Sequence, residues 1–491
     1  MFSLLLNKEL RSILLSPKFP ATFGVASLLM LLSVFVGIRE YQSYTRQYES
    51  ANELVRQEMR ESRSWMGLNS RIYREPDPMQ IFVSGVHNDV GRLSGISSWQ
   101  PIKLINSTYS DDPIFALFRF IDFTFIVQVV LTLFAILFTY DAINGERERG
   151  TLQLMAAQAV PRSSLILAKF AGTWLGLVIP LTIPVLLSLF LLPIFGVPMT
   201  GEHWVRLGLL MVAALLLFTF FAAFGIFVSS VTRRSSVSFL FCLVAWVAVV
   251  LIIPRAAVML AGQIVNVPTV AEVESRQDSF AKDQWNGHLK EMGEVWRKRW
   301  AWLEQFPEKQ REGKREEMEW EWAEEDNKRR KLVQNVIDEN GRVLKEELRN
   351  RKQEQERMAF VLSRFSPVSS FQLAVMNLAS TDVNLKARYE DALNIYRTVF
   401  NQYKEQKQKE SGATGGIRIS VDSDRGIKID TGREIALDLT GVPEFQNQRA
   451  TVASAFEKSV VDFGMLGLFS LIAFGGAFVV FMRYDVRYSS G

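Results

Sequence analysis

The chain contains one run of residues with the glycine spacing of a phosphate-binding loop. Gly145 and Gly150 are separated as in G-x-x-x-x-G, but Thr151 occupies the position of the lysine that would reach the phosphates. The run also follows a long apolar segment, whereas a phosphate-binding loop follows a buried strand. We therefore expect no ATP site and no other cofactor in this chain.

Other residue types that carry chemistry are sparse. The three histidines, His87, His203 and His288, lie far apart, which disfavours a metal cluster or a histidine-based triad. The single cysteine, Cys242, falls inside an apolar run, so no intrachain disulfide forms. A net charge of +4 over 491 residues is too small to predict nucleic-acid binding.

A charged, tryptophan-rich tract follows the fifth apolar run. Its acids, as in "EMEWEWAEEDNKRR", are typical of a solvated helix face with ion pairs one turn apart. Trp296 and Trp300 share a helix face, and Trp302 and Trp322 lie off the faces of Trp300 and Trp320. We expect these rings to pack between antiparallel helices rather than to bind a ligand.

Six apolar runs each have about the 20 residues needed to cross a bilayer. The runs predict this division of the chain: spans at 19–37, 120–140, 170–192, 205–230, 237–260 and 463–482; an interfacial helix at 1–18; a cytoplasmic loop at 141–169; extracytoplasmic segments at 38–119 and 261–460; and a tail at 483–491. Lys and Arg crowd the first segment, the 141–169 loop and the tail. The positive-inside rule therefore puts both termini in the cytoplasm.

The second extracytoplasmic segment, 261–460, is predicted to be mostly helical. Pro307 breaks its first helical tract, and Gly341 in "ENG" predicts a further helix end. "SPVSS" opens another helix, and one more covers about 384–409. The alternation in "IRISVDSDRGIKIDTGREIALDL" predicts a small strand meander. The fold class is thus mainly α: a six-span bundle with a large, mostly helical extracytoplasmic domain that carries a small β meander.

The span centres lack ionisable residues, which disfavours a transporter driven by an ion gradient. Gln128 and Thr132 in the second span favour helix packing over a solute pathway. The very apolar spans favour a lipid-like or otherwise amphipathic cargo, or a lipid-anchored protein, over a hydrophilic solute.

The segment "YDAINGERERGTLQLMAAQAVPRSSLILAKF" resembles the coupling segment of ABC export permeases of the second class, those with the ABCG-like type V fold. The resemblance covers the N-terminal helix and the order of all six spans. "FSPVSSFQLAVMNLASTDV" and "LTGVPEF" further resemble a bacterial branch with a large insertion between the last two spans.

The resemblance implies how the loop works. Its charged turn, Glu146, Arg147, Glu148 and Arg149, would make polar contacts with a separate ATPase, and Gly150, Thr151, Leu152 and Leu154 would belong to the docking helix. It also implies the partners: two ATPase subunits that bind ATP and Mg, and a second permease chain, identical or sibling. A periplasmic partner for the outer domain is a further expectation, as is the bacterial inner membrane.

Two alternatives remain open at this stage. The spans could merely anchor a helical extracytoplasmic scaffold or sensor, since more than half of the chain lies outside them. The 141–169 loop could be a solvated connection that closes a helix hairpin, although two to eight residues suffice for that purpose.

Overall fold

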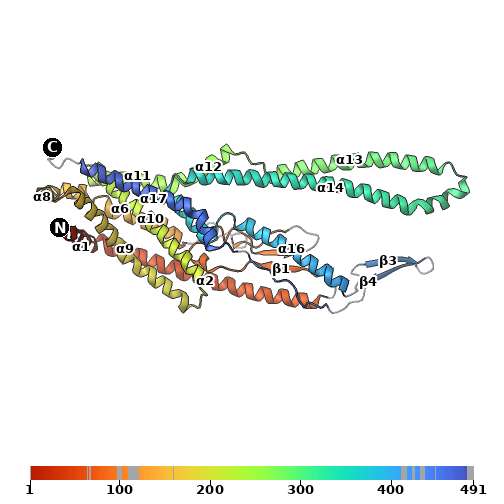
Figure 1. The fold of residues 1–491 in the computed structure, drawn as a ribbon, viewed down its shortest axis with the longest axis horizontal. Coiled ribbons are helices and arrows are strands. Elements are labelled where there is room, and N and C mark those ends of the chain that lie inside the picture. The colour runs from red at the N-terminus through yellow and green to blue at the C-terminus, as the bar shows by residue number, and fades with distance from the viewer. Residues whose placement is uncertain are drawn as a thin grey trace. The chain divides into compact units, whose positions relative to one another are not determined.

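The computed structural model describes residues 2–62, 65, 68–96, 102–108, 121–158, 160–410, 417–422, 426–431, 437–447 and 449–483. Helices dominate this part of the chain (Figure 1). By its internal contacts the chain divides into two units, Met1–Ile252 with Ser366–Gly491, and Ile253–Phe365. The predicted outer domain at 261–460 is therefore divided, because its part after Ser366 belongs with the unit that holds most of the spans.

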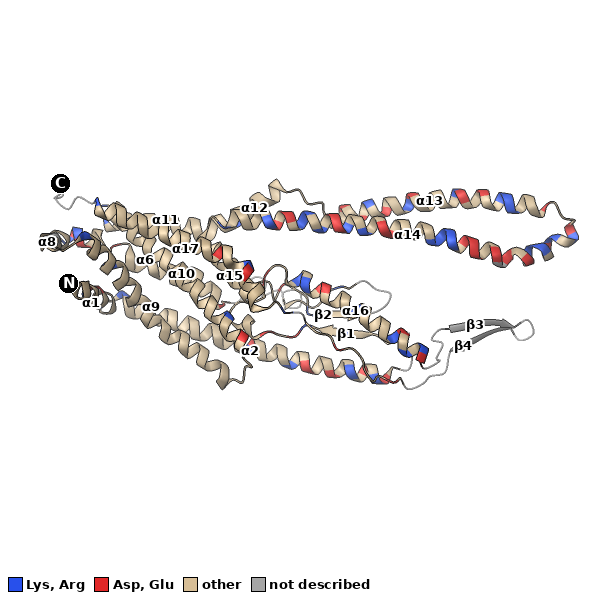
Figure 2. Ribbon diagram, viewed as in Figure 1, with Lys and Arg blue, Asp and Glu red and all other residues tan. Residues whose placement is uncertain are grey.

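Six helices are long and apolar enough to cross a membrane, which confirms the predicted mainly α, six-span fold class. These helices are α2 (Lys18–Glu61), α5–η2–α6–α7 (Phe123–Phe125, Ile126–Leu131, Thr132–Thr139, Asn144–Glu148), α9 (Arg162–Ile194), α10 (Gly201–Val231), α11–η3–α12 (Ser235–Val247, Ala248–Ile252, Ile253–Ile264) and α17 (Val452–Met482). Figure 2 shows how few charges they carry along most of their length. Helix α2 continues unbroken past Gly37, the last residue of the predicted first span, to Glu61.

Small and hydroxylated side chains let the crossing helices approach closely. A Cβ added to Gly225 of α10 would lie 1.9 Å from the Thr139 hydroxyl of α6. Ser470 of α17 donates to the Leu216 carbonyl of α10 at 3.2 Å. Trp246 donates to the Thr132 hydroxyl at 2.9 Å, so Thr132 makes the helix-packing contact expected for it. Helix α10 thus contacts both α6 and α17 through positions without bulky side chains.

The N-terminal helix α1 (Phe2–Leu14) packs along α9. Gly172 and Gly176 of α9 face it one turn apart. A Cβ at Gly172 would lie 2.5 Å from the Glu9 Cβ, and one at Gly176 would lie 3.2 Å from the Ile13 side chain. This small-residue stripe brings the two helix backbones together and places the charged residues of α1 beside Lys169.

The first unit contains a second apolar core, built around α16 (Leu385–Glu410), β1 (Ser70–Tyr73) and β2 (Leu93–Ile96). Strands β1 and β2 pair antiparallel, and sequence analysis did not predict them. Helix α15 (Pro367–Leu378) begins at the Ser-Pro opening that the sequence predicts, with the Ser366 hydroxyl as its cap. Helix α16 packs Tyr389, Leu393, Tyr396 and Phe400 against Leu68, Ile72 and Ile96.

The second unit contains α12 and a long antiparallel hairpin of α13 (Val270–Leu303) and α14 (Glu308–Ser363). Pro307 separates the two helices, as predicted. The helix end predicted at Gly341 is wrong, since α14 runs through it. A Cβ at Gly341 would lie 2.6 Å from the Gln277 side chain of α13, so this glycine serves a close approach between helices rather than a C-cap.

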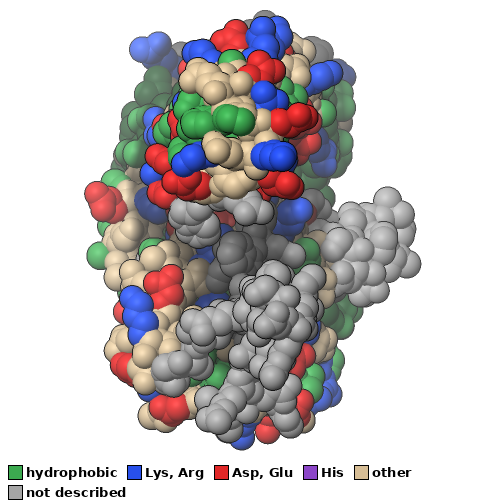
Figure 3. Space-filling model, turned by 90° about the vertical axis from the view of Figure 1, so that its right-hand side faces the viewer, with side chains coloured by type: hydrophobic (Ala, Val, Ile, Leu, Met, Phe, Trp, Pro, Cys, Tyr) green, Lys and Arg blue, Asp and Glu red, His purple; other side chains and the backbone are tan. Residues whose placement is uncertain are grey.

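Only some of the hairpin tryptophans pack between the two helices, whereas the sequence predicts that all of them do. Trp302 packs edge-on against Trp322, with ring centroids 6.0 Å apart. Trp296 and Trp300 are more than half exposed, so the expectation that this pair packs between the helices is wrong. The neighbouring Arg299 makes the contact with α14 instead, pairing with Asp326 at 2.7 Å. At the hairpin end, seen at the top of Figure 3, acidic and basic side chains are interspersed.

The predicted strand meander is a two-stranded hairpin in the described residues. Strands β3 (Ile417–Asp422) and β4 (Gly426–Thr431) pair antiparallel. Part of the predicted third strand, 432–436, lies outside the described residues. Leu437 and Leu439, at the end of the alternating run, pack against the α16 core instead of forming a strand.

The close approach of α1 to α9 predicts an effect for Gly172→Ala. The new Cβ would collide with Glu9 and displace α1. We expect the thermal stability of the purified protein to fall, and a cysteine pair placed across α1 and α9 to cross-link less. Gly467→Ala in α17 is the control, because an added Cβ there meets no described atom within 4 Å. Equal melting temperatures for the two variants would contradict this packing.

Candidate functional site

The loop between the second and third spans folds into two short helices, α7 (Asn144–Glu148) and α8 (Thr151–Ala157). Gly150 joins them at φ 74°, a left-handed conformation that glycine adopts without strain. The Thr151 hydroxyl donates to the Glu146 carbonyl at 3.1 Å and closes the turn. Gly145 lies inside α7, so the glycine spacing does not form the strand–loop–helix geometry of a phosphate-binding loop.

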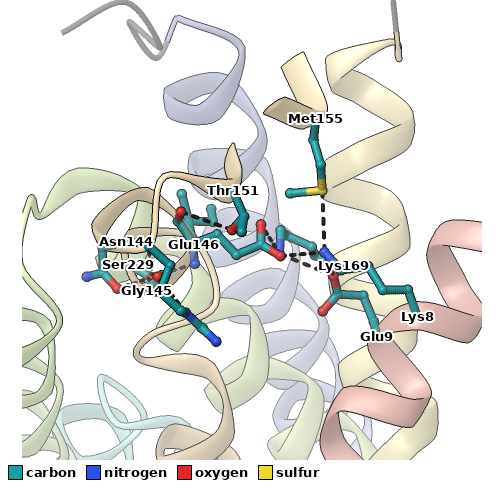
Figure 4. A network of polar contacts seen from close by, with 11 residues as sticks. Lys8, Glu9, Asn144, Gly145, Glu146, Thr151, Met155, Lys169 and Ser229 are labelled. Atoms are coloured by element: carbon teal, nitrogen blue, oxygen red, sulfur yellow. Dashed lines mark hydrogen bonds and ion pairs between the residues drawn. The ribbon is translucent and has the colours of Figure 1, made fainter. Parts of the chain in front are cut away.

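A four-charge cluster holds α7 to the bundle (Figure 4). The Glu146 carboxylate lies 2.7 Å from Lys169 Nζ of α9 and 2.8 Å from Lys8 Nζ of α1. Glu9 of α1 lies 3.3 Å from Lys169 and 3.6 Å from Lys8. Two acids and two lysines from three helices therefore form one ion-pair cluster, which we call the clamp.

The clamp is largely shielded from solvent. The Lys169 side chain is 3% exposed and the Glu146 side chain 11% exposed. A buried lysine is tolerated because the cluster supplies acidic partners, and losing one partner of a buried pair costs about 3 to 5 kcal/mol. Burial alone would lower the pKa of Lys8, but its pairing with Glu146 and Glu9 raises that pKa above the usual 10.5. Lys8 is therefore charged throughout the physiological pH range.

A second set of contacts ties α7 to the fourth and fifth spans. The Asn144 side chain donates to the Thr232 hydroxyl at 3.0 Å and accepts from Ser229 at 3.1 Å. Glu148 accepts from both the backbone N–H and the hydroxyl of Ser235, each at 2.8 Å. Because Ser235 begins α11, the Glu148 carboxylate satisfies an unpaired N–H at that helix start.

The two leucines of α8 point in opposite directions. Leu152 is 3% exposed and belongs to an apolar cluster with Ile143, Ile226 and Phe481. Leu154 is 67% exposed. Residues two apart on a helix face different sides, so burying Leu152 holds α8 against the bundle and leaves Leu154 outside.

The eight residues singled out from the sequence thus occupy two environments. Glu146 and Leu152 are buried against the chain's own helices, and Arg149, Thr151 and Leu154 are exposed. Glu148 is exposed as well, although its carboxylate accepts hydrogen bonds from Ser235. Arg147 and Gly150 are half-buried. The Arg149 side chain also donates to the Gly145 carbonyl at 2.9 Å.

Sequence reasoning missed the partners that position the loop: Lys8, Glu9, Asn144, Lys169, Ser229 and Ser235. Lys169 carried a usable signal, because a lysine inside the apolar run "LILAKFAGTW" needs a partner if it is buried. Lys8 and Lys169 entered the sequence analysis only as charges that orient the spans. Asn144 and Ser229 carried no comparable signal, since their contact joins segments 85 residues apart.

The clamp predicts a non-additive pair of substitutions. Lys169→Gln and Glu146→Gln should each lower the free energy of unfolding by about 3 to 5 kcal/mol, because each leaves a buried charge short of a partner. The double variant should lose less than the sum of the two. Thermal unfolding of the purified protein measures all three.

The matched control is Lys18→Gln. Lys18 pairs with Asp141 at 3.4 Å where both side chains are about one-third exposed, so its loss should cost about 1 kcal/mol or less. Additive effects of Lys169→Gln and Glu146→Gln would show that the clamp does not act as one cluster.

The model of the ABC-2 family of transporter proteins matches residues 4–486. The match includes α1, the clamp, the α7–α8 loop and all six candidate spans. Comparison with curated proteins finds no match for this chain. Since the family model covers nearly the whole chain, the protein belongs to the ABC-2 transporter family, whose members are multi-pass membrane permease subunits that associate with an ABC ATPase.

Proposed function

We propose that the chain is the permease subunit of an ATP-driven exporter, and that α7–α8 is the element on which its ATPase acts. The observation that carries this proposal is the pairing of Leu152 and Leu154: a short helix fixed to the bundle by one leucine presents the other outward. An exposed apolar side chain on a rigid element is a fitting anchor for a partner protein.

The loop residues divide into two roles. Arg149, Thr151 and Leu154 contact the ATPase. Glu146 does not reach it, because its carboxylate is buried and paired with Lys169. Glu148 is exposed, but its carboxylate holds the start of α11 through Ser235. They position the docking helix instead. This proposal assigns fewer residues of the charged turn to contacts with the ATPase than the sequence predicts.

The contacts of α7 supply a route for force. A push on α8 would reach α9 and α1 through the clamp, α10 through Asn144, and α11 through Glu148. These helices then move as rigid bodies between inward- and outward-facing arrangements. ATP and Mg are bound and ATP is hydrolysed by the partner, two copies of which serve a dimer of permeases, identical or sibling. The assembly lies in the bacterial inner membrane with both termini in the cytoplasm.

The cargo is amphipathic or lipid-like, or a lipid-anchored protein. The six spanning helices are strongly apolar, and a hydrophilic solute would find few polar groups along them to replace its water. The rival function is a non-transporting scaffold or sensor. It requires neither ATPase binding nor an intact α7–α8 loop.

Leu154→Arg tests the docking role. We expect the affinity for the ATPase encoded beside this chain to fall at least ten-fold, because a charge would replace an apolar contact; this corresponds to about 1.4 kcal/mol or more. Co-purification and ATPase activity in nanodiscs report the loss. The melting temperature of the permease should not change, since Leu154 is exposed.

Ser236→Arg is the control for added charge, because it places the same charge at an exposed position in the first turn of α11. It should retain ATPase binding. If Leu154→Arg binds the ATPase as the unaltered chain does, α8 is not the docking helix. If both variants lose binding, the effect is one of charge alone.

Shortening the α13–α14 hairpin tests whether it takes part in export. Arg329 pairs with Glu291, and Gly341 approaches Gln277, so residues 286–334 can be replaced by a short Gly/Ser turn without changing the helix register. The Trp302–Trp322 contact is removed, but α15 and α16 are kept. If the hairpin receives cargo, export falls while basal ATPase activity persists. Unchanged export would exclude that role.

A further inference from the structure

A cleft in the outer part of the first unit lies beside α2, β1 and β2. Its volume is about 120 Å³, and its walls include Tyr44, Tyr48, Arg74, His87, Arg92 and Asn106. Two arginines and no carboxylate are among its described lining residues. A second cleft shares Arg74 and His87, so Arg74 lies between the two.

Arg74 is buried and only partly satisfied. Its side chain is at the end of β1 and 6% exposed. One guanidinium nitrogen donates to the His87 carbonyl at 2.7 Å. Among the described residues, Nε and Nη1 have no hydrogen-bond partner, and no carboxylate pairs with Arg74. A buried guanidinium with two unpaired N–H groups is costly unless something accepts them.

The surrounding groups favour an anion. Arg92 lies over the Tyr44 ring at 3.5 Å and donates to the Thr108 hydroxyl, while its Nε has no partner among the described residues. Glu40, whose charge interacts with that of Arg92, accepts from the Tyr44 hydroxyl at 2.8 Å, and Glu75 and Asp77 line the second cleft. Burial, and then the charges of Arg74 and Arg92, hold the pKa of His87 well below its usual range. His87 is therefore neutral and leaves the positive charge to the arginines.

We propose that this cleft binds an oxyanion, the phosphate or carboxylate group of a ligand, with Arg74 as its main anchor and Arg92 as its second. The flat guanidinium fork matches the two oxygens of such a group. Tyr44 and Tyr48 form the wall beside the charged end and provide contact area for the rest of the ligand.

The place of the cleft along α2 allows two sources for this group. Tyr44 and Tyr48 lie roughly 10 to 17 Å beyond Gly37, the predicted end of the first span, at 1.5 Å per residue. This height is near a bilayer surface, where an anionic lipid headgroup and a soluble anion are both within reach. The inference does not depend on export or on ATPase docking.

The test measures binding to the full-length chain in neutral detergent and phosphate-free buffer. Inorganic phosphate, acetate, and vesicles of phosphatidylglycerol in phosphatidylcholine are titrated, with chloride and pure phosphatidylcholine as blanks. Calorimetry and thermal stabilisation report binding. We expect saturable binding of at least one oxyanion probe, and a ten-fold or greater loss of affinity in Arg74→Gln.

Arg71→Gln is the matched control. Arg71 lies on the same strand, is exposed, and pairs with Glu58 at 3.4 Å, so its loss removes the same charge away from the cleft. Its affinity should not change. Binding of phosphate or acetate identifies a soluble anion, and binding of phosphatidylglycerol vesicles alone identifies a lipid headgroup.

Two results would overturn the proposal: no saturable binding of any probe to the unaltered chain, or equal affinity in Arg74→Gln. If Arg74→Gln does not fold, Arg92→Gln takes its place. Unchanged affinity in a folded Arg92→Gln would then count against the site.

Discussion

The buried contact between Glu146 and Lys169 is the interaction on which the position of the α7–α8 loop depends. Lys169 sits at 3% exposure among apolar helices, where an unpaired charge would not be tolerated. Its partners arrive from α7 and α1, and α1 reaches α9 only because Gly172 and Gly176 let the backbones approach. The clamp therefore makes the fixed position of the α7–α8 loop depend on the small-residue stripe of α9.

The fold class was predictable because each membrane-spanning helix requires a long apolar run, which is visible in the sequence. Six apolar runs, the break at Pro307 and the Ser366 cap are local signals, and the structure follows them. The clamp was not predictable in the same way, since Lys8 and Glu146 are 138 residues apart and their pairing is decided by helix packing. Gly341 shows the same limit: a helix end and a close helix contact both call for glycine, and only the neighbour Gln277 distinguishes them.

The loop also reverses the usual distribution of side chains. A carboxylate, Glu146, is inside, and a leucine, Leu154, is outside. From the sequence alone, charged residues are expected to contact a partner and apolar residues to lie in the core. On that basis the whole charged turn is predicted to dock. In the structure, lysines from two helices, α1 and α9, already neutralise Glu146, so its charge serves to hold the loop. A loop held by charge and by Leu152 together resists displacement relative to the spans, and any load placed on α8 is passed on to them.

Helix α2 connects this loop with the outer cleft. Its first residue, Lys18, contacts Tyr140 and Asp141 beside the clamp, and Tyr44 of the same helix lies against Arg92. Helix α10 makes a second connection of this kind. Ser229 near one end donates to Asn144. Arg206 near the other end donates to the Leu378 carbonyl and the Ser380 hydroxyl. Helices α2 and α10 thus provide continuous rigid connections between the Arg74–Arg92 cleft and the α7–α8 loop. If a ligand in the cleft and a partner at α8 favour different arrangements of these helices, each changes the affinity for the other by the same factor.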